Sequence, residues 1–218
     1  GDLDVEVSAL GFGAMRLPKN SDDSADIDEE EAIKMIRHAI DNGVNYVDTA
    51  WPYHEKQSEY VVGKALKDGY REKTYLATKL PVWEVEKEED LDRLLNKQLE
   101  KLQVDKIDFY LLHALSAERW EKVQKFNMIE WGEKKKEEGK IEYLGFSFHD
   151  SYESFDEIIN GHDWDFCQIQ YNYLDTEYQA GLKGLKQAYE KGIGVVIMEP
   201  ISGGWLAQER PKAAQEIF

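Results

Sequence analysis

The sequence predicts an α/β protein built as a (β/α) barrel that is incomplete within its 218 residues. Three observations predict it: short apolar runs alternate with amphipathic stretches, the runs are evenly spaced, and most of them are apolar on successive residues. Such runs suit strands of a parallel sheet that are buried on both faces. No linker or shift in composition marks a boundary, so we expect residues 1–218 to form a single barrel domain.

Seven strands are expected, each followed by a helical pattern or by a loop leading to one. This regular spacing favours a TIM barrel over a doubly wound sheet. A complete (β/α)8 barrel has eight strands and about 250 residues, whereas residues 213–218 still fall within what we interpret as the seventh helix. We therefore expect the eighth strand to be absent. The expected strands are 10–15, 44–48, 74–79, 107–113, 141–148, 166–171 and 194–198.

Amphipathic helices are predicted between the strands by apolar residues that recur on one face. An isoleucine stripe marks residues 29–42, and Gly43 follows as a C-terminal stop. A leucine stripe marks residues 88–103. A third stripe marks residues 178–191 and ends before Gly192. The order of strand and helix is thus kept throughout the chain.

Composition and charge argue against several classes of protein. Asp and Glu number 44 against 27 Lys and Arg, which gives a formal charge of −17 and argues against a nucleic-acid binder. The apolar runs are far shorter than the roughly twenty residues that a bilayer requires, so no membrane segment is expected. Cys167 is the one cysteine, which excludes an internal disulfide and a cysteine-based zinc or iron–sulfur site within these residues. Without a signal segment at the N-terminus, we expect a cytoplasmic protein.

Charged and polar residues stand where the predicted strands end. In a (β/α) barrel the site lies at the C-terminal ends of the strands, and three successive strands end in Asp48, Lys79 and His113. One such residue is common in any protein, but an acid, an amine and an imidazole at one level around the same opening predict a site. Ser147 and Gln168 follow at the ends of the next two strands.

No metal site is expected. The remaining histidines lack the spacing of metal ligands, which argues against a metal-dependent barrel hydrolase. We interpret them as surface residues or as residues that make local hydrogen bonds, with His149 following the fifth strand next to the predicted pocket. They are His38, His54, His149 and His162.

Several motifs occur in a fixed order across nearly the whole chain. They are Gly11-Phe12-Gly13, Asp48-Thr49-Ala50 with Tyr53 five residues after Asp48, Thr78-Lys79, Leu112-His113, Gly145-Phe146-Ser147 and Gln168-Ile169-Gln170-Tyr171-Asn172. In this order they resemble the aldo-keto reductase family. The segments 145–150 and 198–200 are most similar to a bacterial and archaeal branch in which a ferredoxin-like tail often follows the barrel. The resemblance implies an iron–sulfur cluster only if the natural protein continues past Phe218 with such a tail.

The resemblance implies reduction of a small aldehyde or ketone, or the reverse oxidation of an alcohol, with NADP, or NAD, as the cofactor. It assigns Asp48, Tyr53, Lys79 and His113 as the catalytic tetrad. The chemistry agrees, because hydride delivered to a carbonyl carbon leaves charge on oxygen that a proton donor must neutralise. Tyr53 can donate that proton if the Lys79 cation eases its release, Asp48 would hold Lys79 in place, and His113 would orient the carbonyl.

The cofactor residues rest on the same resemblance. Gly11-Phe12-Gly13 lacks the third glycine and the following helix of a Rossmann fingerprint, so we interpret it as a first strand with Ala14 and Met15 at the rim of the site. Ser147 and Gln168 would bind the nicotinamide carboxamide, and Met198 would lie under its ring. The full predicted set for the cofactor is Ala14, Met15, Asp48, Ser147, Gln168, Met198, Glu199, Pro200 and Ile201.

Some alternatives stay open at the level of sequence. The potassium-channel beta subunits share this fold, so the chain could instead be a cofactor-binding regulatory or interaction module with little turnover. Trp51 and Trp83 could form walls of a substrate pocket or be packed loop aromatics. Residues 202–204, Ser-Gly-Gly, could present backbone N–H groups to a pyrophosphate or form a plain turn.

Overall fold

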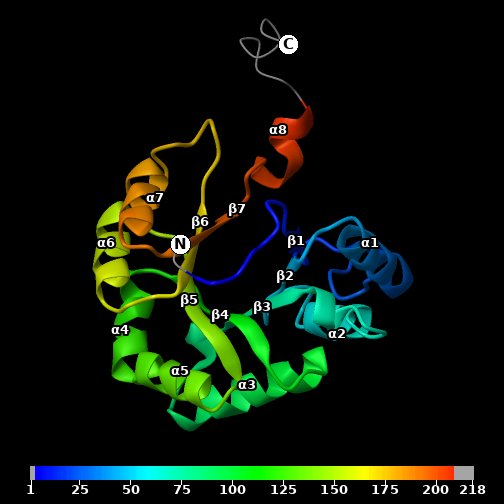
Figure 1. The fold of residues 1–218 in the computed structure, drawn as a ribbon, viewed down its shortest axis with the longest axis horizontal. Helices are drawn as coiled ribbons and strands as arrows, with labels where there is room; N and C mark the ends of the chain where they lie inside the picture. Colours follow the sequence, from blue (N-terminus) through cyan, green and yellow to red (C-terminus); the bar gives the residue numbers. More distant parts are fainter. Residues whose placement is uncertain (1–2, 209–218) are drawn as a thin grey trace, which may run out of the picture.

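The strands of the protein form one open, curved sheet. A computed structural model describes residues 3–208. Its seven strands are hydrogen-bonded in sequence order from β1 to β7, and each neighbouring pair is parallel. Figure 1 shows the strands at the centre and helices α1 to α7 around their outer side, as in an incomplete barrel. Within the described residues the sheet stays open between β7 and β1. The predicted fold is therefore confirmed.

The observed strands follow the apolar runs closely except at the first one. The strand β1 was expected over 10–15 but pairs only at Phe12–Gly13. Upstream of it, the backbone N–H of Asn45 donates to the Oγ of Ser8, and the backbone N–H of Ser8 donates to the Oδ1 of Asn45, which takes the chain out of the ladder. The other strands are β2 Tyr46–Asp48, β3 Tyr75–Leu80, β4 Ile107–Leu115, β5 Ile141–Phe148, β6 Phe166–Gln170 and β7 Gly194–Met198.

Helices connect successive strands. The first, α1 (Glu29–Asp41), begins at Asp28, whose carboxylate accepts a hydrogen bond from the backbone N–H of Glu31. The long α3 (Glu89–Leu102) ends at Gln103 in the left-handed conformation. The helix expected at 213–218 lies outside the described residues. The remaining helices are α2 Ser58–Ala65, α4 Ala117–Lys125, α5 Met128–Glu137, α6 Tyr152–Asn160, α7 Gly181–Glu190 and α8 Trp205–Gln208, with short 3-10 turns at Arg71–Lys73, Val82–Glu84 and Ser202–Gly204.

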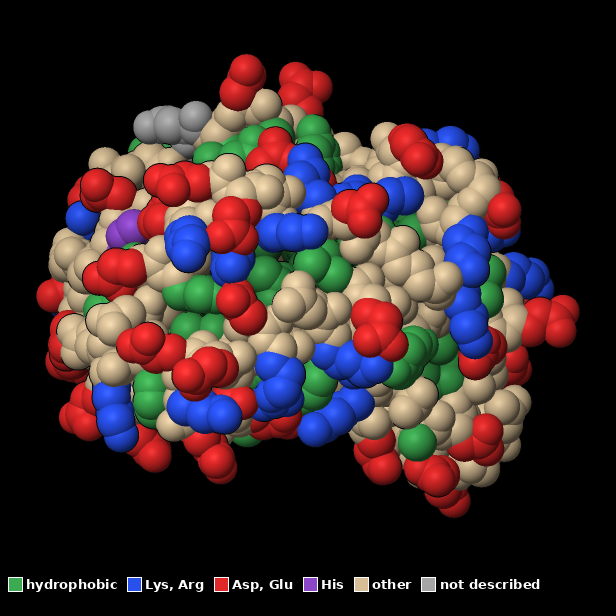
Figure 2. All heavy atoms as spheres, turned by 90° about the horizontal axis from the view of Figure 1, so that it is seen from below, with side chains coloured by type: hydrophobic (Ala, Val, Ile, Leu, Met, Phe, Trp, Pro, Cys, Tyr) green, Lys and Arg blue, Asp and Glu red, His purple; other side chains and the backbone are tan. Residues whose placement is uncertain are grey.

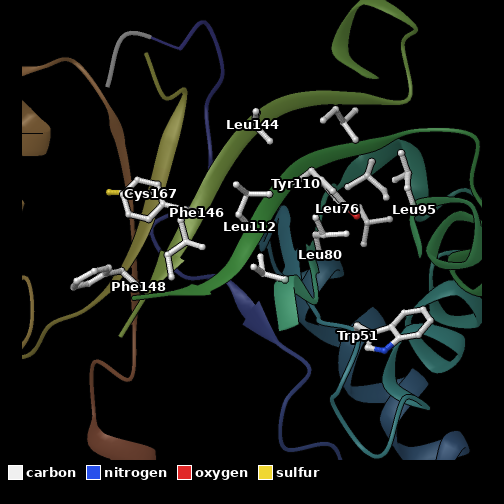
Figure 3. Close-up of a cluster of buried hydrophobic side chains, with 14 of the residues drawn as sticks. Trp51, Leu76, Leu80, Leu95, Tyr110, Leu112, Leu144, Phe146, Phe148 and Cys167 are labelled. Carbon is white, nitrogen blue, oxygen red and sulfur yellow. The ribbon is translucent and has the colours of Figure 1, made fainter. Parts of the chain in front are cut away.

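The core has an outer layer between sheet and helices and an inner layer inside the curve of the sheet. Figure 3 shows the outer layer, where Leu76 and Leu80 of β3 lie near Leu95 of α3. Because side chains alternate along a strand, Ala77 and Lys79 of β3 point inward, whereas Thr78 points outward like the two leucines. The inner layer is an aromatic and aliphatic cluster that Leu3 and Val5 of the N-terminal segment pack against; it comprises Tyr46, Ala77, Phe109, Leu111 and Phe166. This alternation directs Lys79 and His113 into the barrel.

The three charged strand ends are staggered. We expected Asp48, Lys79 and His113 at one level, but Asp48 pairs with Ala77, and Lys79 pairs with Leu111. Lys79 therefore lies two positions beyond Asp48, and His113 lies two positions beyond Lys79. The tilt of barrel strands produces such an offset, and because it equals two residues, all three side chains remain on the inner face.

The surface carries both signs of charge. Figure 2 shows acidic side chains interspersed with Lys and Arg over the face seen from below. Some pairs join neighbouring helices, such as Lys135 of α5 and Asp92 of α3, whose charged atoms lie 2.9 Å apart. Among residues 3–208, no helix combines the length and the apolar character needed to cross a bilayer.

Candidate active site

Lys79 lies at the centre of the site. Its side chain, at the end of β3, is 1% exposed, and its Nζ donates to both carboxylate oxygens of Asp48 at 2.7 and 2.8 Å and to the carbonyl of Thr49 at 2.9 Å. Burial is the largest single influence and acts to lower the pKa of Lys79, but the Asp48 carboxylate and Tyr53 together outweigh it, and the pKa rises above 10.5. Lys79 is therefore a cation that is held in place by its neighbours.

Tyr53 reaches Lys79 from the loop after β2. Its hydroxyl lies 3.3 Å from the Nζ of Lys79, and the ammonium also lies 4.9 Å from the ring centroid. Burial raises the pKa of Tyr53 above 10, and the nearby Lys79 cation opposes that rise. The phenol is thus protonated at neutral pH and lies beside the cation that would stabilise its anion.

His113 completes the arrangement through a local irregularity of β4. Ala114 adopts a left-handed conformation with φ 54°, and its N–H donates to the Oγ of Ser147 at 2.7 Å. The ring of His113 stands edge-on to Tyr53 at 6.2 Å between centroids. Burial, helped by the Lys79 cation, lowers the pKa of His113 well below 6.5, so the imidazole is neutral. Its Nδ1 is buried and has no hydrogen-bond partner within the described part of the chain.

A cavity of about 730 Å³ opens in front of these side chains. Asp48, Tyr53 and His113 line it, and Gln168 on β6 donates to the Oδ2 of Asp48 at 3.3 Å at its floor. Of the residues predicted to bind the cofactor, six line this cavity: Met15, Asp48, Gln168, Met198, Glu199 and Pro200. The other three, Ala14, Ser147 and Ile201, do not. Ala14 and Ser147 are buried, and Ile201 is exposed.

The two tryptophans have different surroundings. Trp51 is 6% exposed, its Nε1 donates to Glu84 at 2.9 Å, and Lys101 lies 4.0 Å from its ring centroid. It is a packed loop residue. Trp83 is 37% exposed, and its ring lies 5.1 Å from that of His113, which places it beside the site.

Other residues of the site were missed from the sequence. Arg16 lines the cavity, as do Tyr46, Phe109 and Phe166 of the inner core layer. His149, which was expected next to the pocket, also lines the cavity. Tyr46, Phe109 and Phe166 could have been found by alternation along the strands. They precede the inward residues Asp48, His113 and Gln168 by two, four and two positions, so their side chains lie on the same face of the sheet. Arg16 carried no such signal, since it lies on a loop after β1.

A buried polar network supports the strand that carries Lys79. Glu59 of α2 accepts hydrogen bonds from the hydroxyl of Thr78 and the amide of Gln98, each at 2.7 Å, and its other oxygen lies 3.2 Å from the Nζ of Lys101. The amide of Gln98 also donates to the carbonyl of Lys79 at 3.0 Å. The network therefore joins α2, α3 and β3 directly behind the site. Within residues 3–208, no cluster of three or more His, Cys, Asp or Glu side chains is arranged to hold a metal ion.

Fold and site together define an incomplete α/β barrel whose pocket holds a phenol, a paired lysine and a neutral imidazole. The sequence model of the aldo/keto reductase family matches residues 9–216, and the chain belongs to that family.

Individual relatives agree with this membership. The protein described as "Probable aldo-keto reductase 1" of Glycine max is 32% identical over 215 residues, which cover 94% of this chain and 59% of that protein. The holo form of an aldo-keto reductase from Bacillus halodurans has a TM-score of 0.79 at 29% identity, over 97% of this chain and 68% of that one. An aldo-keto reductase from Klebsiella pneumoniae in complex with NADPH has a TM-score of 0.72 at 26% identity, over 90% of this chain and 65% of that one. The chain thus spans 59% of the length of the Glycine max relative. The ferredoxin-like tail stays a prediction.

Proposed function

We propose that this protein reduces small aldehydes or ketones with NADPH as the hydride donor and Tyr53 as the general acid, or catalyses the reverse oxidation of an alcohol. The observation that carries the proposal is the 3.3 Å separation between the Tyr53 hydroxyl and the Nζ of Lys79, whose ammonium is also bound to both oxygens of Asp48. A phenol paired with a fixed cation can release a proton that it would otherwise keep at neutral pH.

Each side chain of the site has a distinct part in the reaction. Tyr53 donates its proton to the carbonyl oxygen as that oxygen gains charge, and Lys79 stabilises the phenolate that results. Asp48 keeps Lys79 charged and oriented. His113, which is neutral because of its burial, can orient the carbonyl oxygen through a ring nitrogen without competing for the proton. In the oxidative direction the Tyr53 phenolate would take the proton from the alcohol.

The residues of the cavity fit a nicotinamide dinucleotide. When bound, the reduced nicotinamide supplies the hydride. Gln168 at the floor offers an amide for the carboxamide, and Met198 offers an apolar surface at the end of β7. Gly13 also lines the cavity, and a Cβ added there would meet open space. The Arg16 guanidinium at the outer end can attract phosphate in a chain that is otherwise acidic. That the related protein from Klebsiella pneumoniae is complexed with NADPH supports this cofactor.

Two measurements on the same preparation test the proposal. NADPH is titrated against protein fluorescence, and a panel of small aldehydes and ketones is assayed for carbonyl-dependent loss of NADPH absorbance. We expect binding together with turnover on at least one carbonyl. Binding without turnover on any of them would refute the proposed enzyme and favour the regulatory module.

We also propose a cytoplasmic location. A single cysteine cannot form an internal disulfide bond, and such bonds are typical of proteins in oxidising compartments.

A further inference from the structure

We propose that His54 is a positioning residue for the proton donor. Its two ring hydrogen bonds, to Leu17 and Ser24, tie the loop that carries Tyr53 to the segment after β1, and we call this pair of bonds the clasp. The clasp fixes the position of Tyr53 relative to the cavity wall formed by Met15 and Arg16. The inference rests on the proposed function, since it concerns the geometry of that reaction. From the sequence, His54 was expected to be a surface residue or to make local hydrogen bonds. In the structure it is 9% exposed and bonds to residues far back along the chain.

Both ring nitrogens of His54 are engaged, and their partners define the tautomer. The backbone N–H of Leu17 points at Nε2 at 2.9 Å, and the carbonyl of Ser24 lies 2.8 Å from Nδ1. An amide can only donate and a carbonyl can only accept. The ring must therefore be neutral, with its proton on Nδ1 and a free lone pair on Nε2. No other protonation state of the imidazole satisfies both contacts.

The loop that carries Tyr53 needs such a tether. His54, Glu55 and Lys56 are consecutive left-handed residues with φ of 50°, 52° and 73°, a conformation that L-residues adopt at a cost and hold only where the surroundings impose it. Within the loop, the N–H groups of Lys56 and Ser58 donate to the carbonyl of Tyr53 at 3.1 and 3.2 Å. These bonds close the turn on itself but do not fix it against the rest of the site.

The other end of the clasp lies on the cavity wall. Met15 and Arg16 line the cavity, and Leu17 directly after them donates to His54. On the near side of this segment, the hydroxyl of Ser58 donates to the carbonyl of Ala14 at 2.9 Å. The wall at 15–16 is thus held between two bonds, and both come from the loop or helix start that follows Tyr53. A further hydrogen bond joins the same two segments, because the Ser24 hydroxyl donates to the carboxylate of Glu55 at 2.7 Å.

A purely structural role and a positioning role predict different data. If His54 sets the site, its loss must weaken cofactor binding and slow turnover together, because the cavity wall and the proton donor separate. A misplacement of about 1 Å at a catalytic group can cost about 100-fold in rate. If His54 only packs, its loss lowers thermal stability and leaves both quantities unchanged in the fraction that is folded.

The first test reads the wild-type protein directly. Long-range ¹H–¹⁵N correlation spectra of the histidine rings should show His54 as the Nδ1–H tautomer at neutral pH, and hydrogen exchange should show a protected Leu17 amide. An Nε2–H tautomer, or a Leu17 amide that exchanges freely, would overturn the clasp. Neither readout depends on turnover, so the clasp is tested even if the proposed function fails.

The second test compares three variants by NADPH dissociation constant, kcat and melting temperature. His54→Leu removes both bonds and should lower kcat at least about tenfold and weaken NADPH binding. His54→Gln keeps an acceptor toward Leu17 and should restore most of both losses. His162→Gln, whose parent side chain pairs with Glu133 and does not line the cavity, is the matched control and should behave as wild type.

The outcomes separate the two proposals. If His54→Leu melts earlier but keeps wild-type kcat and NADPH affinity, the positioning role is wrong. If His54→Leu does not fold, the positioning role is decided by the other two readouts: it stands if the wild type has the Nδ1–H tautomer and His54→Gln keeps kcat and NADPH affinity, and it falls if either result is absent. If the wild type binds NADPH but turns over no carbonyl, the proposed function fails, while the effect of His54 on NADPH affinity still tests the clasp.

Discussion

Replacing Lys79 with methionine removes the cation beside Tyr53 and keeps much of the volume of the side chain. At the 3.3 Å between Nζ and the phenol oxygen, an ammonium and a phenolate attract by about 5 kcal/mol at an effective dielectric constant near 20. This is an upper bound, because the Asp48 carboxylate on the same ammonium opposes it. One neighbouring charge typically moves a pKa by about 1–3 units. The pKa of Tyr53, already above 10 through burial, should therefore rise further, and the phenol should become a poorer acid.

We expect Lys79→Met to lower kcat for carbonyl reduction by about 100-fold or more, the usual contribution of a general acid. The variant also leaves Asp48 buried without its cation, and breaking a buried pair in this way destabilises a fold by about 3–5 kcal/mol. A loss of activity could therefore reflect unfolding. The double variant Asp48→Asn/Lys79→Met is the control, because it removes both charges and should recover part of the stability.

The assay is carbonyl-dependent oxidation of NADPH at saturating cofactor, with urea unfolding measured on the same samples. We expect the double variant to be more stable than Lys79→Met and equally slow. If turnover returns together with stability in the double variant, Lys79 acts only as a structural partner of Asp48, and the reasoning from the distance between Lys79 and Tyr53 is refuted.

Three further predictions concern stability and reactivity. Burial depresses the pKa of His113 well below 6.5, so the unfolded chain takes up a proton first as the pH falls below 6.5 and the wild type loses stability by up to about 1.4 kcal/mol per pH unit. Urea unfolding of His113→Asn should show a shallower acid slope, and equal slopes would contradict this. The pKa of the buried Cys167 thiol is raised to about 12, so iodoacetamide should label it only after unfolding, and rapid labelling of the native protein would be inconsistent with its burial. Gly63→Ala would place a Cβ 2.6 Å from the carbonyl oxygen of Leu102 and should cost about 1–3 kcal/mol by overpacking, whereas Gly13→Ala, which meets open space, should melt as the wild type does.

Much of the fold could be predicted from the sequence, because parallel strands that are buried on both faces appear as runs of successive apolar residues. Their apolar runs give the strand positions, and all their C-terminal ends meet at one rim. For this reason Asp48, Lys79 and His113, far apart along the chain, could be predicted to lie together. The stagger between them could not, because it depends on the tilt of the strands in the curved sheet rather than on any single strand.

The parts that escaped prediction depend on contacts between distant segments. The left-handed run after Tyr53 has no glycine to indicate it, and the structure holds it through a histidine that bonds to Leu17 and Ser24. The short β1 likewise follows from bonds between Ser8 and Asn45. In the sequence, Glu59 is one of several polar residues in an amphipathic stretch. Only the packing of α2 against α3 shows that its side chain is buried.

The most direct test of the account is the behaviour of Tyr53→Phe, which removes one oxygen atom beside Lys79. We expect NADPH to bind this variant with nearly the wild-type affinity, while carbonyl-dependent loss of NADPH absorbance falls to background. Turnover at the wild-type rate in Tyr53→Phe would show that the proton comes from elsewhere and would contradict the central claim.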